Sequence, residues 1–433
     1  MTSKTALYLA LLLGFASVAP AAIVGTNVPA QSITAERIAG LPWTQRGAWK
    51  KYLDHSTRQR EADQAFFRNE MKEHGLKEAS NAPPSRTFVG IRLSGPAEWY
   101  AGEEARRIAD IIVSFQTPAG GWSKRLDMTR HVRFPGELFT TDNNSRYLSD
   151  TDFDTPHDVH WNYVGTFDND ATTTQLWYLA KVIAALKPGD SEKYRASFLR
   201  GLDYIFAAQF PNGGWPQVWP LQGGYHDTIT YNDGAMVHVL ELLFAVQNDR
   251  EEFAFVPAKT RKLAAASLAR GVKCVVATQI VVNGRRTVWC QQHDAFTLEP
   301  ASARNYEMPS LCSAESAGLM IFLMKLPDPD RKVVAAVQGA AAWLQKTAVR
   351  DVAFRNVGDT GRHLVPAPGE GPIWSRYYEI GTDRPIFGDR DKSIHDSLDE
   401  ISRERRAGYS WYGDSPLGAL DLYRVWSKSH PAR

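Results

Sequence analysis

The sequence predicts a mainly helical protein whose helices pair into hairpins and close into a toroid, with long loops on its surface. Three observations predict this class. One motif that ends helices recurs along the chain, a second motif that begins helices alternates with it, and β-strand patterns are rare. An open α-solenoid is the alternative, but the long and unequal loops between the helices disfavour it.

The first motif marks helix ends. It reads Gln-Thr-Pro-Ala-Gly-Gly-Trp at residues 116–122 and Gln-Phe-Pro-Asn-Gly-Gly-Trp at 209–215, and a weaker third copy ends at Gln279. Each copy follows a segment whose apolar residues recur with helical spacing. Because Pro and Asn-Gly interrupt helices, each copy is expected to close one helix of a pair.

The second motif marks helix starts. It reads Thr-Phe-Asp-Asn-Asp-Ala at 166–171 and Thr-Tyr-Asn-Asp-Gly-Ala at 230–235. Elsewhere, an Asp or Ser followed by Pro is typical of the N-terminus of a helix. Helices are therefore predicted over 170–186, 233–246, 309–326, 328–348 and 415–426. A small β-hairpin is predicted over 281–288, around the Asn-Gly pair at 283–284.

The chain of 433 residues divides into an export signal and one domain. Residues 1–22 combine a positive Lys4, an apolar run too short to span a bilayer and the small residues Ala19 and Ala21. This pattern predicts a removed signal peptide. Residues 23–433 are predicted as a single domain with a charged helical extension over about 34–75. We expect a secreted or periplasmic monomer that stays outside the membrane once the signal is removed.

The charge and the cysteines exclude several classes of protein. The formal net charge is +2, which lacks the basic excess typical of proteins that coat nucleic acid, so no nucleic-acid partner is expected. The cysteines are Cys274, Cys290 and Cys312, without a Cys-x-x-Cys pair. Their odd number allows at most one bridge within the chain, and three buried thiols are the favoured interpretation.

Tryptophan is abundant, with 13 residues. For any single tryptophan, burial in the core is the more common role. Seven tryptophans in predicted loops, two of which directly follow Gly-Gly pairs, nevertheless suggest a groove that stacks flat ligands such as sugar rings. These seven are Trp122, Trp161, Trp215, Trp219, Trp289, Trp374 and Trp411.

Acidic and amide side chains gather at two predicted helix starts. They are Asp168, Asn169 and Asp170 in one motif, and Asn232 and Asp233 in the other. Helix capping alone accounts for such residues. If the two helix starts converge, however, their oxygens form the kind of site that Ca²⁺ prefers, although no EF-hand loop is present. Two of the carboxylates could equally be the acid and base of a glycoside hydrolase.

Three arginines lie in late loops beside aromatic residues: Arg304, Arg376 and Arg390. A guanidinium can hold a carboxylate through two parallel hydrogen bonds. Surface ion pairing is the simpler interpretation of any one of them. For Arg390 the neighbouring Asp389 and Asp391 could supply such a pair.

From about residue 34 to the C-terminus, the chain resembles the pectate lyases of polysaccharide lyase family 10. Seven segments in one order carry the resemblance, at 120–124, 167–172, 209–217, 229–233, 289–294, 306–310 and 387–391. The resemblance implies an (α/α)₃ toroid that forms the catalytic domain. It also implies cleavage of polygalacturonate by β-elimination with Ca²⁺ as cofactor.

The resemblance further implies a role for each site residue. Asp168 and Asp233 would hold the metal, and Arg390 would be the base. Substrate would be bound by Lys124, Asn169, Arg304, Tyr306 and Arg376. The chain departs from the family at Asp170, where a small residue such as Gly is expected, so the roles of Asp168 and Asp170 stay open. A glycoside hydrolase with paired aspartates and a non-catalytic uronate-binding protein are the alternatives.

Overall fold

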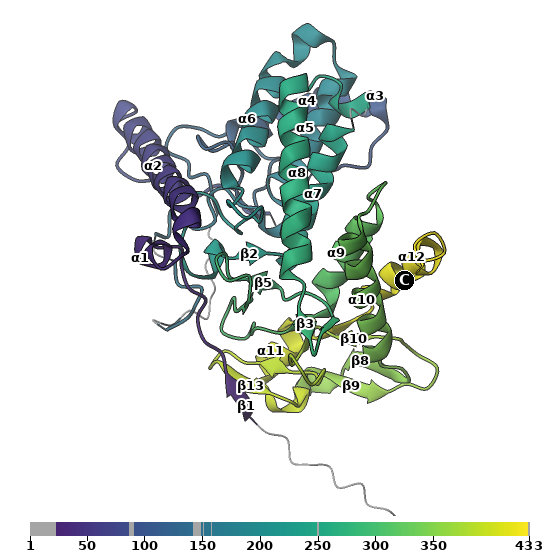
Figure 1. Cartoon of the computed structure of the whole chain (residues 1–433). Helices are drawn as coiled ribbons and strands as arrows, with labels where there is room; N and C mark the ends of the chain where they lie inside the picture. Colours follow the sequence, from purple (N-terminus) through teal and green to yellow (C-terminus); the bar gives the residue numbers. More distant parts are fainter. Residues whose placement is uncertain are drawn as a thin grey trace, which may run out of the picture.

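The computed structural model describes residues 23–85, 91–141, 149, 151–156, 158–248 and 251–431. The predicted signal peptide, residues 1–22, therefore lies outside the described residues. Over the described part the chain is mainly helical with short strands, which confirms the predicted helical class (Figure 1). None of the helices in these ranges is both long and apolar enough to cross a membrane.

Two rows of three helices form the body of the molecule. The first row is α5 (Thr173–Ala185), α7 (Ala235–Gln247) and α9 (Ser313–Met324), in contact in that order. The second row is α6 (Glu192–Ala208), α8 (Ala258–Thr278) and α10 (Arg331–Thr347), and each packs on the first-row helix that precedes it. At the two ends of this array, α4 (Glu103–Ser114) packs on α5 and α6, and α12 (Pro416–Trp426) packs on α9 and α10.

The helix-ending motif makes the same contacts in all three copies. In each, the glutamine Nε2 donates to a carbonyl of the following loop and to a carbonyl of the next helix in the second row. Gln116 bonds Gly120 and Ser197 at 2.8 and 2.9 Å, Gln209 bonds Gly213 and Ser267 at 2.9 Å each, and Gln279 bonds Thr287 and Ala336 at 2.9 and 2.8 Å. The repeated motif in the sequence thus forms a repeated hydrogen-bonded connection between adjacent helices.

Six of the seven loop tryptophans belong to the core, so the expectation that they line a groove is wrong for these six. Six of the seven are at most 1% exposed, and only Trp161 is partly exposed. Four of them donate the indole N–H to a carbonyl in the preceding helix, at 2.7–2.9 Å: Trp122 to Ile112, Trp215 to Ile205, Trp289 to Val275 and Trp374 to Leu344. The rings cover helix C-termini, where backbone carbonyls lack partners within the helix.

The first-row helices begin a few residues later than the sequence predicts. Short 3₁₀ turns precede two of them, at Asp168–Asp170 and at Asn232–Gly234, and α9 begins at Ser313 rather than at 309. A residue with positive φ interrupts each turn, Asn169 at 51° and Asp233 at 49°, which an α-helix does not accept. The acidic residues therefore lie ahead of the helices instead of inside them.

The predicted N-terminal extension is a short helix, α1 (Ala35–Ala39), and one long helix, α2 (Trp43–Glu73), which lies at one side of the molecule (Figure 1). Gly40 and Pro42 separate the two. Trp49 on α2 packs on Phe210 and Phe296, with ring centroids 5.4 and 4.7 Å apart. The extension therefore joins the main core, next to the loop that follows α6.

The strands are short and occur mostly between helices. The predicted hairpin is confirmed as β3 (Val281–Val282) and β4 (Arg285–Arg286), with positive φ at Asn283 and Gly284. A longer hairpin was not predicted, β8 (Val352–Asn356) with β9 (Arg362–Pro366). The other pairs and sheets are β1 (Ile23–Thr26), β13 (Ser393–His395) and β12 (Phe387–Gly388); β2 (Ile229–Thr230), β5 (Gln292–His293) and β6 (Pro300–Ala301); β7 (Leu311–Cys312) and β11 (Tyr377–Tyr378); and β10 (Trp374–Ser375) and β14 (Tyr412–Gly413).

Two remaining helices are short, α3 (Ala97–Tyr100) and α11 (Arg403–Gly408). The three cysteines are buried and carry free thiols, as the sequence predicts.

Candidate active site

Two equivalent turns bring the predicted acidic residues together. The turn before α5 and the turn before α7 are in contact, and each has its second residue in the left-handed region. These second residues, Asn169 and Asp233, meet side chain to side chain, since Asn169 Nδ2 donates to Asp233 Oδ2 at 3.0 Å. The convergence of the two helix starts, which the sequence suggested, is thus observed.

Asp168 forms a buried ion pair with Lys124. The ammonium lies 2.6 Å from Oδ2, and the side chains are 1% and 3% exposed, respectively. Lys124 Nζ also lies 3.3 Å from the centroid of the Tyr163 ring. Burial opposes the charge of Asp168, but Lys124 outweighs it and lowers the pKa of the carboxyl. The other oxygen, Oδ1, is buried and has no hydrogen-bond partner among the described residues.

Asp233 is held by amides instead of a cation. Asn169 and Asn232 both donate to its Oδ2, at 3.0 and 3.2 Å. Although part of Asp233 reaches solvent, partial burial and then the charge of Asp168 raise its pKa to about 6. Asn232 in turn accepts a hydrogen bond from Arg376, at 3.2 Å, and another from Gln291.

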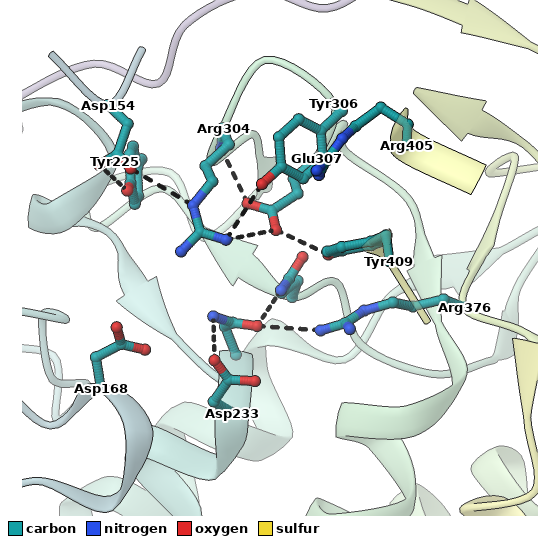
Figure 2. Close-up of polar contacts among 12 residues, drawn as sticks. Asp154, Asp168, Tyr225, Asp233, Arg304, Tyr306, Glu307, Arg376, Arg405 and Tyr409 are labelled. Atoms are coloured by element: carbon teal, nitrogen blue, oxygen red, sulfur yellow. Dashed lines mark hydrogen bonds and ion pairs between the residues drawn. The ribbon is translucent and has the colours of Figure 1, made fainter. Parts of the chain in front are cut away.

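Arg304 faces the two carboxylates from the opposite side. Figure 2 shows its guanidinium and that of Arg376 turned toward the same space as Asp168 and Asp233. Arg304 Nε lies 3.6 Å from Asp154, and Nη1 lies 3.4 Å from Glu307. Burial disfavours its charge, but Glu307 outweighs this effect and the pKa of Arg304 is raised well above its usual value. In the ligand-free protein, Arg304 is a cation.

Asp154 links Arg304 to the tyrosines beside Lys124. Its Oδ1 accepts hydrogen bonds from Tyr163 at 3.2 Å and from Tyr225 at 2.5 Å. Tyr163 is the ring that Lys124 contacts, so one network of side chains connects Lys124 with Arg304. Lys124 and Arg304 therefore contact members of the same network, Tyr163 and Asp154, respectively.

Arg376 is fixed by a second carboxylate, Glu315 in the first turn of α9. Arg376 Nη2 lies 2.6 Å from Glu315 Oε1, and the thiol of Cys312 donates to Oε2 at 2.6 Å. The guanidinium also lies 4.8 Å from the Tyr409 ring. Glu315 raises the pKa of Arg376 against the effect of burial, so Arg376 is a fixed positive charge at the rim of the site.

Arg390 has a different carboxylate partner from the ones expected. Asp389 accepts from Ser402 and Asp391 accepts from Ser393, whereas Arg390 Nε and Nη2 donate to Glu404 at 2.8 and 3.1 Å. Both Arg390 and Arg405 lie against the Tyr306 ring, at 5.4 and 4.4 Å, and both pair with Glu404. Tyr306 therefore joins this pair of arginines to Arg304, which donates to its hydroxyl at 3.4 Å.

Asp170 does not join the cluster. Its carboxylate lies 2.7 Å from Nδ1 of His238 on α7. The side chains of Asp170 and His238 are 44% and 35% exposed, respectively. Asp168 is therefore the carboxylate of this turn that meets Lys124 and the site.

The protein alone offers a small set of metal ligands. Within the described ranges, no group of three or more His, Cys, Asp or Glu side chains gathers in a way that could hold a metal ion. Asp168 and Asp233 are the carboxylates that the two converging turns bring to the site, whereas Asp154, Glu307 and Glu315 pair with arginines. Oδ1 of Asp168 has no hydrogen-bond partner among the described residues, and burial followed by the charge of Asp168 raises the pKa of Asp233. Both observations mark a place where a cation would be favoured.

Several residues of the site could not be found from the sequence. No local pattern separates Asp154, Glu315, Glu404 and Tyr409 from surface residues. The arginines with which the three acids pair lie in other segments: Arg304 for Asp154, Arg376 for Glu315 and Arg390 for Glu404. Glu307 could have been found through its position, because it follows the predicted Tyr306 within the segment 306–310.

Comparisons with known proteins identify a family for the chain. The model of the pectic acid lyase family matches residues 116–419. The chain belongs to this family. A family 10 polysaccharide lyase from Cellvibrio cellulosa has a similar structure, with a TM-score of 0.63 and 30% identity, covering 77% of this chain and 96% of that one.

A mutant of the Cellvibrio enzyme in complex with trigalacturonic acid matches equally well, with a TM-score of 0.63, 30% identity, and 77% and 98% of the two chains covered. Among curated protein sequences no significant match is found. All seven segments that carry the resemblance lie within the residues of this pectate lyase that the family model matches. Its helices α1 and α2 lie outside the residues that the family model matches.

Proposed function

We propose that this enzyme cleaves polygalacturonate by β-elimination, with Ca²⁺ as cofactor, in the cleft between Asp168, Asp233 and Arg304. The observation that carries the proposal is the convergence of two carboxylates and two fixed arginines on one space (Figure 2). The buried Lys124 pairs with one of these carboxylates, Asp168. The trigalacturonic acid bound to the similar Cellvibrio structure supports the choice of substrate.

The reaction has a specific electrostatic requirement. A base removes the proton from C5 of a galacturonate residue, the bond from C4 to the glycosidic oxygen breaks, a C4–C5 double bond forms, and the leaving oxygen takes up a proton. Negative charge develops on the uronate carboxyl during proton removal, so fixed cations at that position stabilise the transition state. Arg376, held in place by Glu315, and Lys124, held by Asp168, are suited to this role.

Asp168 and Asp233, with Asn169 beside them, are the residues that would hold Ca²⁺. When bound, the ion would neutralise the uronate carboxylate and so make the C5 proton more acidic. Because the protein supplies two carboxylates, the substrate is expected to contribute further oxygen ligands. The amide hydrogen bonds from Asn169 and Asn232 orient the Asp233 carboxylate for this task.

An arginine is the proposed base, and two arginines are candidates. The family resemblance assigns the role to Arg390, which pairs with Glu404 and would have to leave it. The geometry offers Arg304 as well, since its charge acts on both Asp168 and Asp233. Either guanidinium must first lose its proton. For Arg304, Glu307 opposes this loss, because it raises the pKa against the effect of burial.

The test is the absorbance of the product. β-Elimination creates a conjugated double bond that absorbs in the ultraviolet, whereas hydrolysis does not. We expect absorbance to rise on polygalacturonate and to stop when a chelator removes the metal. Reducing ends released without absorbance would indicate the glycoside hydrolase alternative, and binding without either product would indicate a non-catalytic uronate-binding protein.

Two arginine variants then separate the candidate bases. Arg304→Lys and Arg390→Lys keep a positive charge, so substrate binding is retained better than in alanine variants, while the base is changed. The variant of the true base loses kcat by about 10³-fold or more with a smaller change in KM. The variant of the other arginine changes mainly KM. Wild-type kcat in both variants would exclude both assignments.

The remaining expectations are proposals of the same kind. We propose that the two helix rows belong to an (α/α)₃ toroid and that the enzyme is a secreted or periplasmic monomer. The helical hairpins in their observed order support the toroid. Activity in the medium or periplasm of cells that make the full chain, together with the mass of the processed N-terminus, tests the export signal.

A further inference from the structure

A cavity of about 340 Å³ lies beside the active site, between α2, residues 153–156 and 158–162, and the loop at 222–226. Its size is in the range of small-molecule binding sites. Its walls include Arg60, Gln64, Phe153, Trp161, Gln222 and His226. No residue assigned to the reaction lines it.

His226, one of the residues that line the cavity, carries a buried polar atom without a hydrogen-bond partner. The His226 side chain is 10% exposed, and its Nε2 has no hydrogen-bond partner among the described residues. Burial lowers the pKa of His226 to about 4, so the ring is neutral at physiological pH. A neutral imidazole nitrogen without a partner costs free energy that a hydroxyl group of a ligand would recover.

The same histidine connects the cavity with the active site. His226 Nε2 lies 3.8 Å from Asp154 Oδ1, and Asp154 is the carboxylate beside Arg304. Phe153 forms a second connection, because its backbone N–H donates to the side chain of Asn305 at 3.0 Å. The cavity therefore adjoins the side of the site where Arg304 lies.

The remaining walls suit a uronic acid. Phe153 and Trp161 offer aromatic surface for the C–H face of a sugar ring. Arg60 is exposed on α2, and one of its five N–H groups is used by the Leu221 carbonyl at 3.3 Å, so others are available for a carboxylate. The acidic wall residue Asp158 is hydrogen-bonded by Gln64 at 3.4 Å.

We propose that this cavity is a distal subsite that binds a galacturonate residue of the same polysaccharide chain, away from the cleaved bond. Arg60 binds the uronate carboxylate, His226 binds a hydroxyl group, and Phe153 and Trp161 contact the ring. The subsite depends on α2, which lies outside the residues that the family model matches. The inference rests on the proposed function, since it extends the substrate of the same site.

The test compares long and short substrates. The kcat/KM of the full-length enzyme is measured by ultraviolet absorbance on polygalacturonate and on trigalacturonate. We expect Arg60→Ala to lower kcat/KM on polygalacturonate, relative to kcat/KM on trigalacturonate, by about tenfold. This is the effect of losing one hydrogen bond to a charged group. Arg58→Ala is the matched control, because Arg58 is exposed on the same helix and does not line the cavity. The control keeps the wild-type ratio.

A second variant changes a cavity residue that lies outside α2. Phe153→Ala removes aromatic surface, and we expect it to lower the same ratio by several-fold, with thermal unfolding measured alongside to detect loss of folded enzyme. Equal losses on both substrates, or a wild-type ratio in Arg60→Ala, would overturn the subsite. If wild-type enzyme gives no absorbance on polygalacturonate, the proposed function fails instead, so the two failures are distinguishable.

Discussion

The turns before α5 and α7 both contain a left-handed residue at their second position, but their carboxylates have different partners. In the first, Asp168 precedes the left-handed residue and meets the buried ammonium of Lys124. In the second, Asp233 is itself the left-handed residue and meets two amides. The internal repeat supplies the same scaffold twice, and the partners at each copy determine the chemistry.

The difference shows in the protonation of the two groups. Lys124 lowers the pKa of Asp168, whereas partial burial and the nearby charge of Asp168 raise the pKa of Asp233 to about 6. Asp168 is therefore a permanent anion, and Asp233 is a group that can gain or lose a proton near neutral pH. A site with one fixed and one adjustable carboxylate can bind a cation without carrying two unpaired negative charges in its absence.

The largest effect is expected from breaking the buried pair. Asp168→Asn leaves the Lys124 ammonium buried without a counter-charge, which is expected to cost about 3–5 kcal/mol of stability. Because the same change removes a proposed ligand for Ca²⁺, lyase activity should fall at least 10³-fold. Urea unfolding and ultraviolet absorbance measure the two effects separately.

The double variant Lys124→Met/Asp168→Leu is the control for this prediction. Replacing both partners by apolar groups removes the unpaired charge, so much of the lost stability should return. Activity should stay low, because both side chains face the site. If activity returned with stability, Asp168 and Lys124 would have a structural role only.

The next largest effect concerns the pH dependence of Asp233. Its folded-state pKa of about 6 is above the usual value of 3.8, so ionisation destabilises the fold and this cost appears as pH rises between these values. Asp233→Asn should therefore be more stable than wild type above pH about 6, with the difference shrinking toward pH about 4. Thermal unfolding across this range measures it.

Activity should respond to the same group with the opposite consequence. In wild type, kcat/KM is expected to fall as pH decreases through about 6, because protonated Asp233 cannot hold a cation. Asp233→Asn should lose about 10²-fold in activity and should lack this acidic limb. An unchanged limb in the variant would assign the titration to another group and remove Asp233 from the metal site.

The sequence predicted this comparison only in part. The two helix-start motifs, the helical class and the convergence of their polar residues followed from local patterns, because capping and turn residues act within a few positions. The burial of Trp122 or Trp215 did not follow, since their indole N–H groups bond carbonyls of the preceding helix. The pairing of Asp154 with Arg304 joins segments that are far apart in the chain, and Glu404 on α11 pairs with Arg390 in the preceding loop. No local pattern records either contact.

The smallest effect is expected at Asp170, which resolves the division of labour within the first turn. Asp170 has φ of 62°, where a side chain is strained and Gly is favoured, and the equivalent residue of the second turn is Gly234 with φ of 72°. Asp170→Gly should relieve about 1 kcal/mol of strain and lose an ion pair with His238 of comparable size, since that pair is partly exposed. Lyase activity should stay within about twofold of wild type, since Asp170 contacts neither Lys124 nor Asp233 through any observed bond.

The pH dependence of this variant gives a second readout. Burial disfavours the charged form of His238, but Asp170 outweighs it and raises the pKa of the ring. A raised histidine pKa stabilises the fold at low pH, and this contribution is lost as pH rises through the folded-state value. Asp170→Gly should therefore be about as stable as wild type near pH 6 and more stable near pH 8, as measured by thermal unfolding. A tenfold loss of activity would instead make Asp170, and not Asp168 alone, a functional carboxylate of this turn.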